Sequence, residues 1–551
     1  MKKSLVLMLA VILVTSLFAG CGQGGGKTTT DAILYYACGS EPYLTLDPSV
    51  ENSNGVCVLQ NVYETLTRYN DQTGEVEPYL ATSWTHNDDG TVWEFTLRED
   101  VSFHDGTKMN ANAVKKSIDR TIKLGKGAAY IWTNVESVEV VSDYVVRFNC
   151  SEATSVDLIA SAAYAAYIMS ENACEQDGDW FNSESGNDGG TGPYMVKSIV
   201  TGDQVLLSAY DGYWREWKEN SYKMVVIKKH VESGTRRQLL ETGEAQIAYN
   251  FSTTDIAALK SNENVEVKYV NTYNNILLFL NSEKLPCSNE EFRKALAYSF
   301  PYEEVINGVL ENRGQLSHGL VTPGLWGHDE NCTQYEFNLD KARECLANSG
   351  IDASTVKLEF AVQSGYTEYK DFAQLWQTYL KEIGINMEIR ERGWDAHIEH
   401  ARATRPEDRQ DIFVMIWWPD YADPSSWFQS MVHSQENPAF NLSYIKNAEW
   451  DAKIEEAMRL TATDRAKAEE LYKEVQKGVL DGAYMLPVYD QVKCIADVRC
   501  AKRYGYADTR LHSDRFMGSV GRCFCAYYYA WLYHCALSYR TRCAHDALCA
   551  A

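Results

Sequence analysis

The sequence lacks the short motifs of the commonest hydrolytic and nucleotide-dependent enzymes. It has no G-x-S-x-G nucleophile elbow, no H-E-x-x-H zinc helix and no phosphate-binding G-x-x-x-x-G-K-[ST] loop. Basic residues are also scarce: 52 Lys and Arg stand against 76 Asp and Glu, a formal net charge of −24. Nucleic acid requires a basic surface, so this balance argues against a nucleic-acid partner. We therefore expect no enzyme activity, no metal site and no cofactor.

The N-terminal apolar run is too short to span a membrane. It covers residues 4–18 behind a basic start, whereas a spanning helix needs about 20 apolar residues, so residues 1–20 are expected to be a signal peptide. The run ends in "LFAGC", which resembles the lipobox of bacterial lipoproteins, with Phe18 where Leu is more usual. This resemblance implies diacylation of Cys21, and residues 21–30 are expected to be a flexible tether. The alternative is a fortuitous cysteine after an ordinary signal peptide.

Cysteines are unevenly distributed. Seven lie between residues 22 and 492 with no C-x-x-C pair, and seven more crowd the last 58 residues. The spacing in that tail lacks a zinc knuckle, so a Cys/His zinc module is one hypothesis and a disulfide-rich extension is another. We favour a third, a non-native or frame-altered end. The tail cysteines are Cys494, Cys500, Cys523, Cys525, Cys535, Cys543 and Cys549.

The body between these ends has the pattern of an α/β protein. Short alternating or apolar strand segments are separated by amphipathic helical segments in two long stretches, and no 20–50-residue repeat is present. A chain of 551 residues is too long for one core. The pattern predicts two or three domains, built as α/β lobes with mostly parallel sheets.

Residues 78–120 carry a long motif that resembles a known family. The run reads "PYLATSWTHNDDGTVWEFTLREDVSFHDGTKMNANAVKKSIDR". It is similar to the signature of the peptide/nickel-type extracytoplasmic solute-binding proteins of ABC importers. Shorter matches occur in order along about 450 residues and stop near residue 492. They include "TLDP", "GTGPY", "FRKALAYSF", "NLDKARECLANSG", "YLKEIGINMEI" and "YMLPVYD".

The resemblance implies a two-lobe, periplasmic-binding-protein-like α/β fold of cluster C with mixed sheets. Two hinge crossovers, expected near residues 271–280 and 487–493, would let the lobes close on a ligand. The expected domains are lobe I at 31–275 with an extra subdomain at 55–190, lobe II at 276–487, and a return to lobe I followed by the divergent tail at 488–551.

The resemblance also implies a function. We expect a monomeric lipoprotein that is held at the outer face of the cell membrane or in the periplasm through the lipid on Cys21. It would capture dipeptides or oligopeptides and deliver them to the permease of an ABC transporter. The alternatives are the same fold binding a nickel chelate, haem or another amine-bearing nutrient, and a lipoprotein that senses peptides without feeding an importer. An exported hydrolase that uses Asp420 and Asp423 is the rival enzyme, and their i, i+3 spacing in a Pro-containing turn argues against it.

The stretch "WWPDYADPSSWF", residues 417–428, is the main candidate site. It follows the apolar run "DIFVMI", and a loop at the carboxyl end of such a strand opens onto the ligand crevice of an α/β sheet. By resemblance, Asp420 pairs with the ligand's α-ammonium, Asp423 with Pro424 shapes the turn, and Trp417, Trp418 and Tyr421 surround the ligand. The competing interpretation of Asp420 is a plain loop carboxylate.

Two further positions complete the expected ligand site. The arginine that holds the ligand's carboxylate in dipeptide-binding relatives corresponds to Lys370, which offers a point charge and no bidentate fork. Trp394 corresponds to an aromatic residue that faces the cleft, although ordinary packing is an equal alternative.

Two histidine-containing motifs are candidates for a catalytic or metal site. His104 and Asp105 in "FHDG" are interpreted as a turn between a strand and a helix. His397 and His400 in "HIEH" are interpreted as residues of a solvated helix, because no third ligand lies near them in the sequence.

Overall fold

The computed structural model describes residues 33–217 and 221–498. The signal peptide, the tether, Cys21 and all of the Cys-rich tail beyond residue 498 lie outside the described residues, so the predictions about them stay predictions. Within the described part, no helix combines the length and apolarity needed to cross a membrane.

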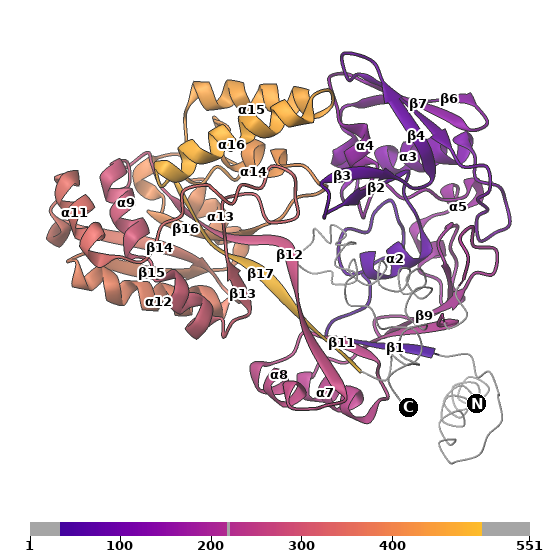
Figure 1. The fold of residues 1–551 in the computed structure, drawn as a ribbon, viewed down its shortest axis with the longest axis horizontal. Coiled ribbons are helices and arrows are strands. Elements are labelled where there is room, and N and C mark those ends of the chain that lie inside the picture. Colours follow the sequence, from indigo (N-terminus) through magenta and orange to yellow (C-terminus); the bar gives the residue numbers. More distant parts are fainter. Residues whose placement is uncertain (1–32, 218–220, 499–551) are drawn as a thin grey trace, which may run out of the picture. The chain divides into compact units, whose positions relative to one another are not determined.

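The described strands form three sheets (Figure 1). The largest has eleven strands and runs in the order β15-β14-β16-β12-β17-β11-β1-β10-β9-β8, with β13 beside β17. Its bounds are β1 Ile33–Cys38, β8 Tyr194–Val200, β9 Gln204–Ala209, β10 Met224–Lys229, β11 Ile247–Tyr249, β12 Val265–Leu280, β13 Gly314–Leu316, β14 Lys357–Gln363, β15 Asn386–Arg392, β16 Ile412–Trp417 and β17 Met485–Val498. The two smaller sheets are β2 Thr67–Asn70 with β3 Glu75–Pro78, and β4 Ala81–His86, β5 Val92–Leu97, β7 Val145–Cys150 and β6 Val135–Ser142 in that order.

The helices fall into two groups along the chain. The first group is α2 Val56–Val62, α3 Ala111–Leu124, α4 Val156–Ile159, α5 Glu171–Cys174, α6 Gly178–Phe181, α7 Ser233–Thr242 and α8 Thr253–Lys260. The second is α9 Glu290–Ser299, α10 Tyr302–Glu304, α11 Leu339–Ser349, α12 Thr367–Glu382, α13 Trp394–Ala401, α14 Ser425–Met431, α15 Ala448–Thr461 and α16 Arg465–Asp481. We call the part with the first helix group lobe I and the part with the second lobe II.

Lobe II is a three-layer sandwich because its strands are apolar on both faces. In β12, Ile276 and Leu278 join one core while Leu277 and Phe279 join the other. The first core packs under α9, α11 and α12, and the second packs under α13 to α16. Successive side chains of a strand point to opposite faces, so a continuous apolar run fills both layers at once.

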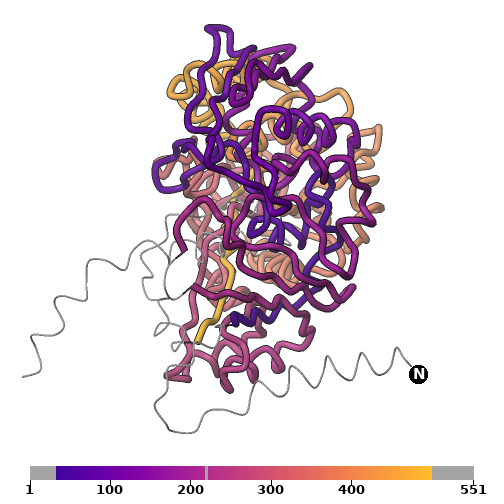
Figure 2. Tube along the Cα trace, turned by 90° about the vertical axis from the view of Figure 1, so that its right-hand side faces the viewer, coloured from indigo at the N-terminus to yellow at the C-terminus, as the bar shows by residue number. Residues whose placement is uncertain are grey.

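The long strands β12 and β17 join the lobes. They pair antiparallel from Val265↔Val498 to Phe279↔Met485, and the register is interrupted between Asn271 and Asn275. In both Figure 1 and Figure 2 the yellow β17 runs beside the magenta β12. The expected crossovers fall on these strands, and the exact domain boundaries stay a prediction.

The expectation of mostly parallel sheets is wrong. The pairs β1–β10, β1–β11, β14–β15 and β14–β16 are parallel, whereas every described pair that involves β12 or β17 is antiparallel. The physical reason is the connectivity: β12 leads into lobe II and β17 returns from it. Strands that run in opposite directions side by side form antiparallel ladders.

Asp490 lies on β17, one of the two strands that join the lobes, and its burial can be tested by the pH dependence of stability. Its carboxylate is 3% exposed and accepts a hydrogen bond from the hydroxyl of Ser317 at 2.5 Å. Burial raises its pKa to about 7. The folded state therefore holds the proton more tightly than the unfolded chain, and stability is lost as pH rises from about 4 towards 7.

We predict that Asp490→Asn removes this loss. The variant should match the wild type near pH 4 and exceed its unfolding free energy by about 1–3 kcal/mol at pH 8. Thermal unfolding at both pH values measures the difference. Equal destabilisation at both pH values would contradict the assignment of a protonated, buried Asp490.

Candidate functional site

The loop that follows β16 carries the candidate residues. The strand is buried from Ile412 to Met415, lies between β14 and β12, and ends at Trp417. The loop then passes Pro419 and enters α14 at Ser425. Strand and helix thus hold the loop at both ends.

Asp423 stabilises the start of α14. Its Oδ1 accepts a hydrogen bond from the backbone N–H of Ser425 at 2.8 Å, and its own carbonyl accepts one from Ser426 N–H at 3.3 Å. The residue is 5% exposed, and burial raises its pKa. The prediction that Asp423 and Pro424 shape the turn is confirmed, because the first N–H groups of a helix need such an acceptor.

Asp420 has a different environment. Its Oδ1 accepts a hydrogen bond from Tyr164 Oη at 3.4 Å, and Tyr130 on the short turn Ala129–Trp132 also donates to it. Burial raises the pKa of Asp420, and the two tyrosine donors act against that rise. Among the described residues, no Lys, Arg or His forms an ion pair with this carboxylate. A half-buried carboxylate without an ion-pair partner can accept a cationic group.

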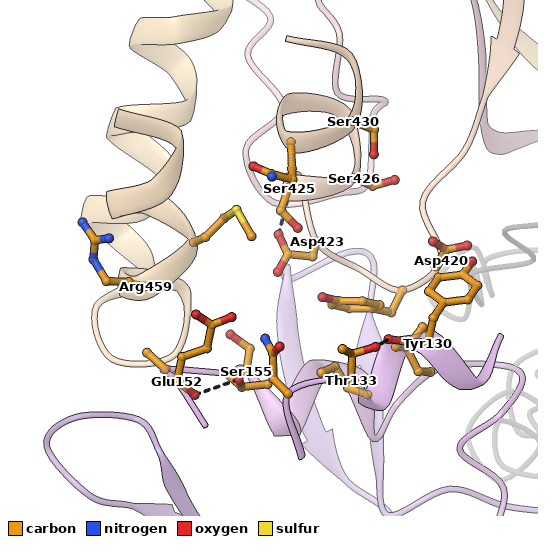
Figure 3. Close-up of a pocket in the computed structure, with 18 of the residues that line it drawn as sticks. Tyr130, Thr133, Glu152, Ser155, Asp420, Asp423, Ser425, Ser426, Ser430 and Arg459 are labelled. Carbon is orange, nitrogen blue, oxygen red and sulfur yellow. Dashed lines mark hydrogen bonds between the residues drawn. The ribbon is translucent and has the colours of Figure 1, made fainter. Parts of the chain in front are cut away.

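A cavity of about 730 Å³ opens beside Asp420 (Figure 3). One wall comes from lobe I residues 130–159 and the other from lobe II residues 420–459. Its size is within the range of small-molecule and peptide pockets. The lining residues are Tyr130, Ile131, Thr133, Asn134, Glu152, Ala153, Thr154, Ser155, Ile159, Asp420, Tyr421, Asp423, Ser425, Ser426, Gln429, Ser430, His433, Glu455, Met458 and Arg459.

Of the other expected ligand residues in this loop, Tyr421 alone lines that cavity. Trp417 instead donates from Nε1 to Ser426 Oγ at 3.2 Å and packs edge-on against Phe440. The carbonyl of Trp418 accepts from the same Ser426 hydroxyl at 3.4 Å. The side chain of Trp417 and the backbone of Trp418 are thus bonded to the start of α14, and the expected role of both residues towards a ligand stays a prediction.

Lys370 and Trp394 lie outside this cavity. Lys370 Nζ pairs with Glu391 Oε2 at 3.3 Å, with both side chains substantially exposed. Trp394 begins α13 with 41% of its surface exposed. The structure does not bring either residue together with Asp420 in the cavity, and their expected roles also stay predictions.

Sequence reasoning missed the lobe I side of the site. Its contacts join segments that are far apart in the chain. Tyr130 and Tyr164 reach Asp420, and Asp157 forms an ion pair of 3.0 Å with Arg465. No local pattern marks these residues. The one signal available was the aromatic density of "AAYIW" and "AAYAAYI", which is equally typical of core packing.

His104 belongs to a structural pair. Its Nδ1 pairs with Asp188, and its Nε2 donates to the carbonyl of Gly192 at 2.8 Å. Burial opposes protonation, yet the neighbouring Asp188 carboxylate outweighs it, so the pKa of His104 is raised. Asp105 accepts from the N–H of Thr107 at 3.0 Å, as the turn interpretation of "FHDG" requires. The two residues do not form a dyad with each other.

The solvated-helix interpretation of "HIEH" is wrong for His397. This side chain is fully buried and stacks on Phe413 with ring centroids 4.0 Å apart. Burial lowers its pKa to about 4. His400, partly exposed, pairs with Glu359 at 2.9 Å. The reason is that α13 packs against the sheet, so this face of the helix is part of the core. No cluster of three or more metal-ligating side chains occurs in the described residues.

The two aspartates of the loop should respond differently to mutation. We predict that Asp423→Ala lowers the unfolding free energy by about 1 kcal/mol, because the Ser425 N–H loses its acceptor. Asp423→Asn keeps an acceptor oxygen and should be as stable as the wild type. Urea unfolding measures both variants, and equal losses in the two would refute the capping role.

Comparisons with known proteins place the chain in a family. Residues 75–439 match the family model described as "Bacterial extracellular solute-binding proteins, family 5 Middle". The probable D,D-dipeptide-binding periplasmic protein DdpA of Escherichia coli (strain K12) is 29% identical over 458 residues, 80% of this chain and 85% of the relative. Heme-binding protein A of Haemophilus influenzae is 24% identical, over 89% and 94% of the two chains.

Solved structures show the same fold. The periplasmic binding protein DppA from Helicobacter pylori, in complex with the peptide STSA, has a TM-score of 0.64 at 24% identity, over 85% of this chain and 94% of that one. A nickel ABC transporter protein from Bacillus halodurans has a TM-score of 0.73 at 20% identity, over 85% and 95%. The two-lobe, mixed-sheet α/β fold is thereby confirmed, and the family model covers well over half of the sequence. The chain belongs to family 5 of the bacterial extracellular solute-binding proteins, which serve ABC importers.

Proposed function

We propose that this protein is a lipid-anchored extracytoplasmic receptor that binds peptides by their free amino terminus and delivers them to an ABC permease. The observation that carries the proposal is Asp420. Its carboxylate lines the cavity and has tyrosine hydroxyls as neighbours, with no basic ion-pair partner among the described residues. The α-ammonium of a peptide is the cationic group that would complete this site.

The physical argument rests on desolvation. A carboxylate that is partly removed from water is stabilised by a cation at hydrogen-bonding distance far more than an exposed one is. Tyr130 and Tyr164 come from lobe I while Asp420 belongs to lobe II. A ligand amine held between them would therefore stabilise the contact between lobes. This is the closure-coupled binding that the family resemblance implies.

The names of several relatives support the peptide class. They include a di/tripeptide-binding protein of Pseudomonas aeruginosa, 25% identical over 460 residues. The haem and nickel proteins among the relatives make those ligands the alternatives. Mass spectrometry of the ligand released by denaturing the purified protein distinguishes the classes: recovered peptides support the proposal, and a haem or nickel chelate overturns it.

Asp420→Asn gives the sharper test. We predict that ligand-freed Asp420→Asn binds a tripeptide at least about 30-fold more weakly than the wild type in calorimetry, because removing a buried charge partner costs about 2–5 kcal/mol. Its melting temperature should be unchanged or slightly raised, since burial already disfavours the Asp420 charge.

Two controls accompany this variant. Asp395→Asn removes an exposed carboxylate at the start of α13 and should bind like the wild type. The N-acetylated tripeptide lacks the ammonium and should bind wild type and Asp420→Asn equally weakly. Undiminished binding of the free tripeptide by Asp420→Asn would show that the amine is held elsewhere.

A further inference from the structure

The cavity beside Asp420 carries more negative charge than one ammonium neutralises. Four carboxylates line it, against one arginine and one histidine. Arg459 is already paired with Glu456, which does not line the cavity, at 2.6 Å. His433 contacts one lining carboxylate, Glu455, at 3.2 Å. The lining carboxylates are Glu152, Asp420, Asp423 and Glu455.

These carboxylates are spread along the cavity. Figure 3 shows Asp420 and Glu152 at opposite ends of the view, with Asp423 and Thr133 between them. Asp423 is engaged in capping α14, whereas Glu152 has no ion pair among the described residues. Arg459 lies on the Glu152 side of the same view, but its guanidinium is paired with Glu456, so an amine held at Asp420 leaves the Glu152 end of the cavity acidic.

A buried hydroxyl at the same end points to a ligand independently. Ser155 lines the cavity, is 6% exposed, and its Oγ has no hydrogen-bond partner among the described residues. Buried hydroxyls in proteins are almost always hydrogen-bonded, so this N-cap hydroxyl of α4 is free to bond a group that enters the cavity. Figure 3 places Ser155 beside Glu152.

We propose that this end of the cavity is a subsite for the basic side chain of a peptide, so that the protein prefers peptides with Lys or Arg near the amino terminus. The proposal rests on the proposed function, since Asp420 must hold the α-ammonium. Glu152 and Glu455 would then attract the side-chain cation, and Ser155 Oγ would accept one of its N–H groups. A ligand carboxylate at this position would face like charges, which selects against acidic peptides.

The volume fits this assignment. A cavity of about 730 Å³ accommodates more than an amino terminus. Its remaining polar wall consists of hydroxyl and amide groups such as those of Thr133, Ser425 and Gln429, which accept hydrogen bonds from an ammonium or a guanidinium. The formal net charge of −24 also favours the approach of cationic peptides.

Three matched tripeptides test the preference in the wild-type protein. Ala-Lys-Ala, Ala-norleucine-Ala and Ala-Glu-Ala differ in the charge at the end of one side chain. We expect the lysine peptide to bind about tenfold more tightly than the norleucine peptide in calorimetry at low salt, and the glutamate peptide to bind most weakly. The lysine advantage should shrink at 0.5 M NaCl because exposed charges are screened.

Variants locate the subsite. Glu152→Gln and Glu455→Gln should each lower the affinity for Ala-Lys-Ala by about three- to fivefold, and the double variant should remove the lysine advantage. In each of them the affinity for Ala-norleucine-Ala should fall by less than the affinity for Ala-Lys-Ala, because the norleucine side chain carries no charge. Glu470→Gln, an exposed carboxylate of α16 outside the cavity lining, is the matched control and should leave all three affinities unchanged.

Each outcome decides between the two proposals. If the wild type binds none of the three peptides, the peptide function fails and the subsite fails with it. If lysine and norleucine peptides bind equally well, the subsite is refuted while the peptide function stands. If the lysine advantage survives in the double variant, the basic side chain binds elsewhere. Unchanged melting temperatures exclude misfolding as the cause of a loss.

Discussion

The pairing of β12 with β17 is the constraint on which the rest of the structure depends. Both strands cross from one lobe to the other, and their side chains enter different cores along their length. Val265 and Val498 pack in the lobe I core with α7 and α8, whereas Ile276 and Leu486 pack in lobe II. One antiparallel ladder therefore supplies backbone hydrogen bonds to both lobes. Where its register is interrupted, between Asn271 and Asn275, fewer ladder bonds hold the two strands together.

Because β12 and β17 run from one lobe to the other, the cavity has one wall from each lobe. Tyr130 and Tyr164 belong to lobe I, and the loop with Asp420 follows a central strand of lobe II. The ion pair of Asp157 with Arg465 and the hydrogen bond from Trp326 N–H to Tyr69 Oη, at 2.9 Å, also join the lobes. Of the four carboxylates that line the cavity, Asp423 is buried, Asp420 is half-buried, and Glu152 and Glu455 are exposed, so an opposite charge is worth most at the buried end.

Several features could be predicted from the sequence because they depend on local patterns. The apolar run of β16 was predicted as a strand, and the turn role of Asp423 with Pro424 was predicted by resemblance to the family. The turn in "FHDG" was predicted from the local pattern. The direction of the strands was not predicted from local patterns. The alternation of strands and helices favours parallel sheets and does not reveal that the two long strands β12 and β17 pair antiparallel. His397 was also misjudged, because spacing alone cannot tell which face of a helix packs on a sheet.

The sequence by itself therefore determined the family, the α/β lobes and the loop that bears Asp420, since each is encoded by residues close together in the chain. Only the tertiary structure decided what surrounds that carboxylate. Tyr130, Glu152 and Ser155, which are distant in the chain, line the same cavity as this loop, and burial raises the pKa of Asp420. Burial and charge pairing depend on which distant segments share a cavity, and no spacing along the chain specifies that.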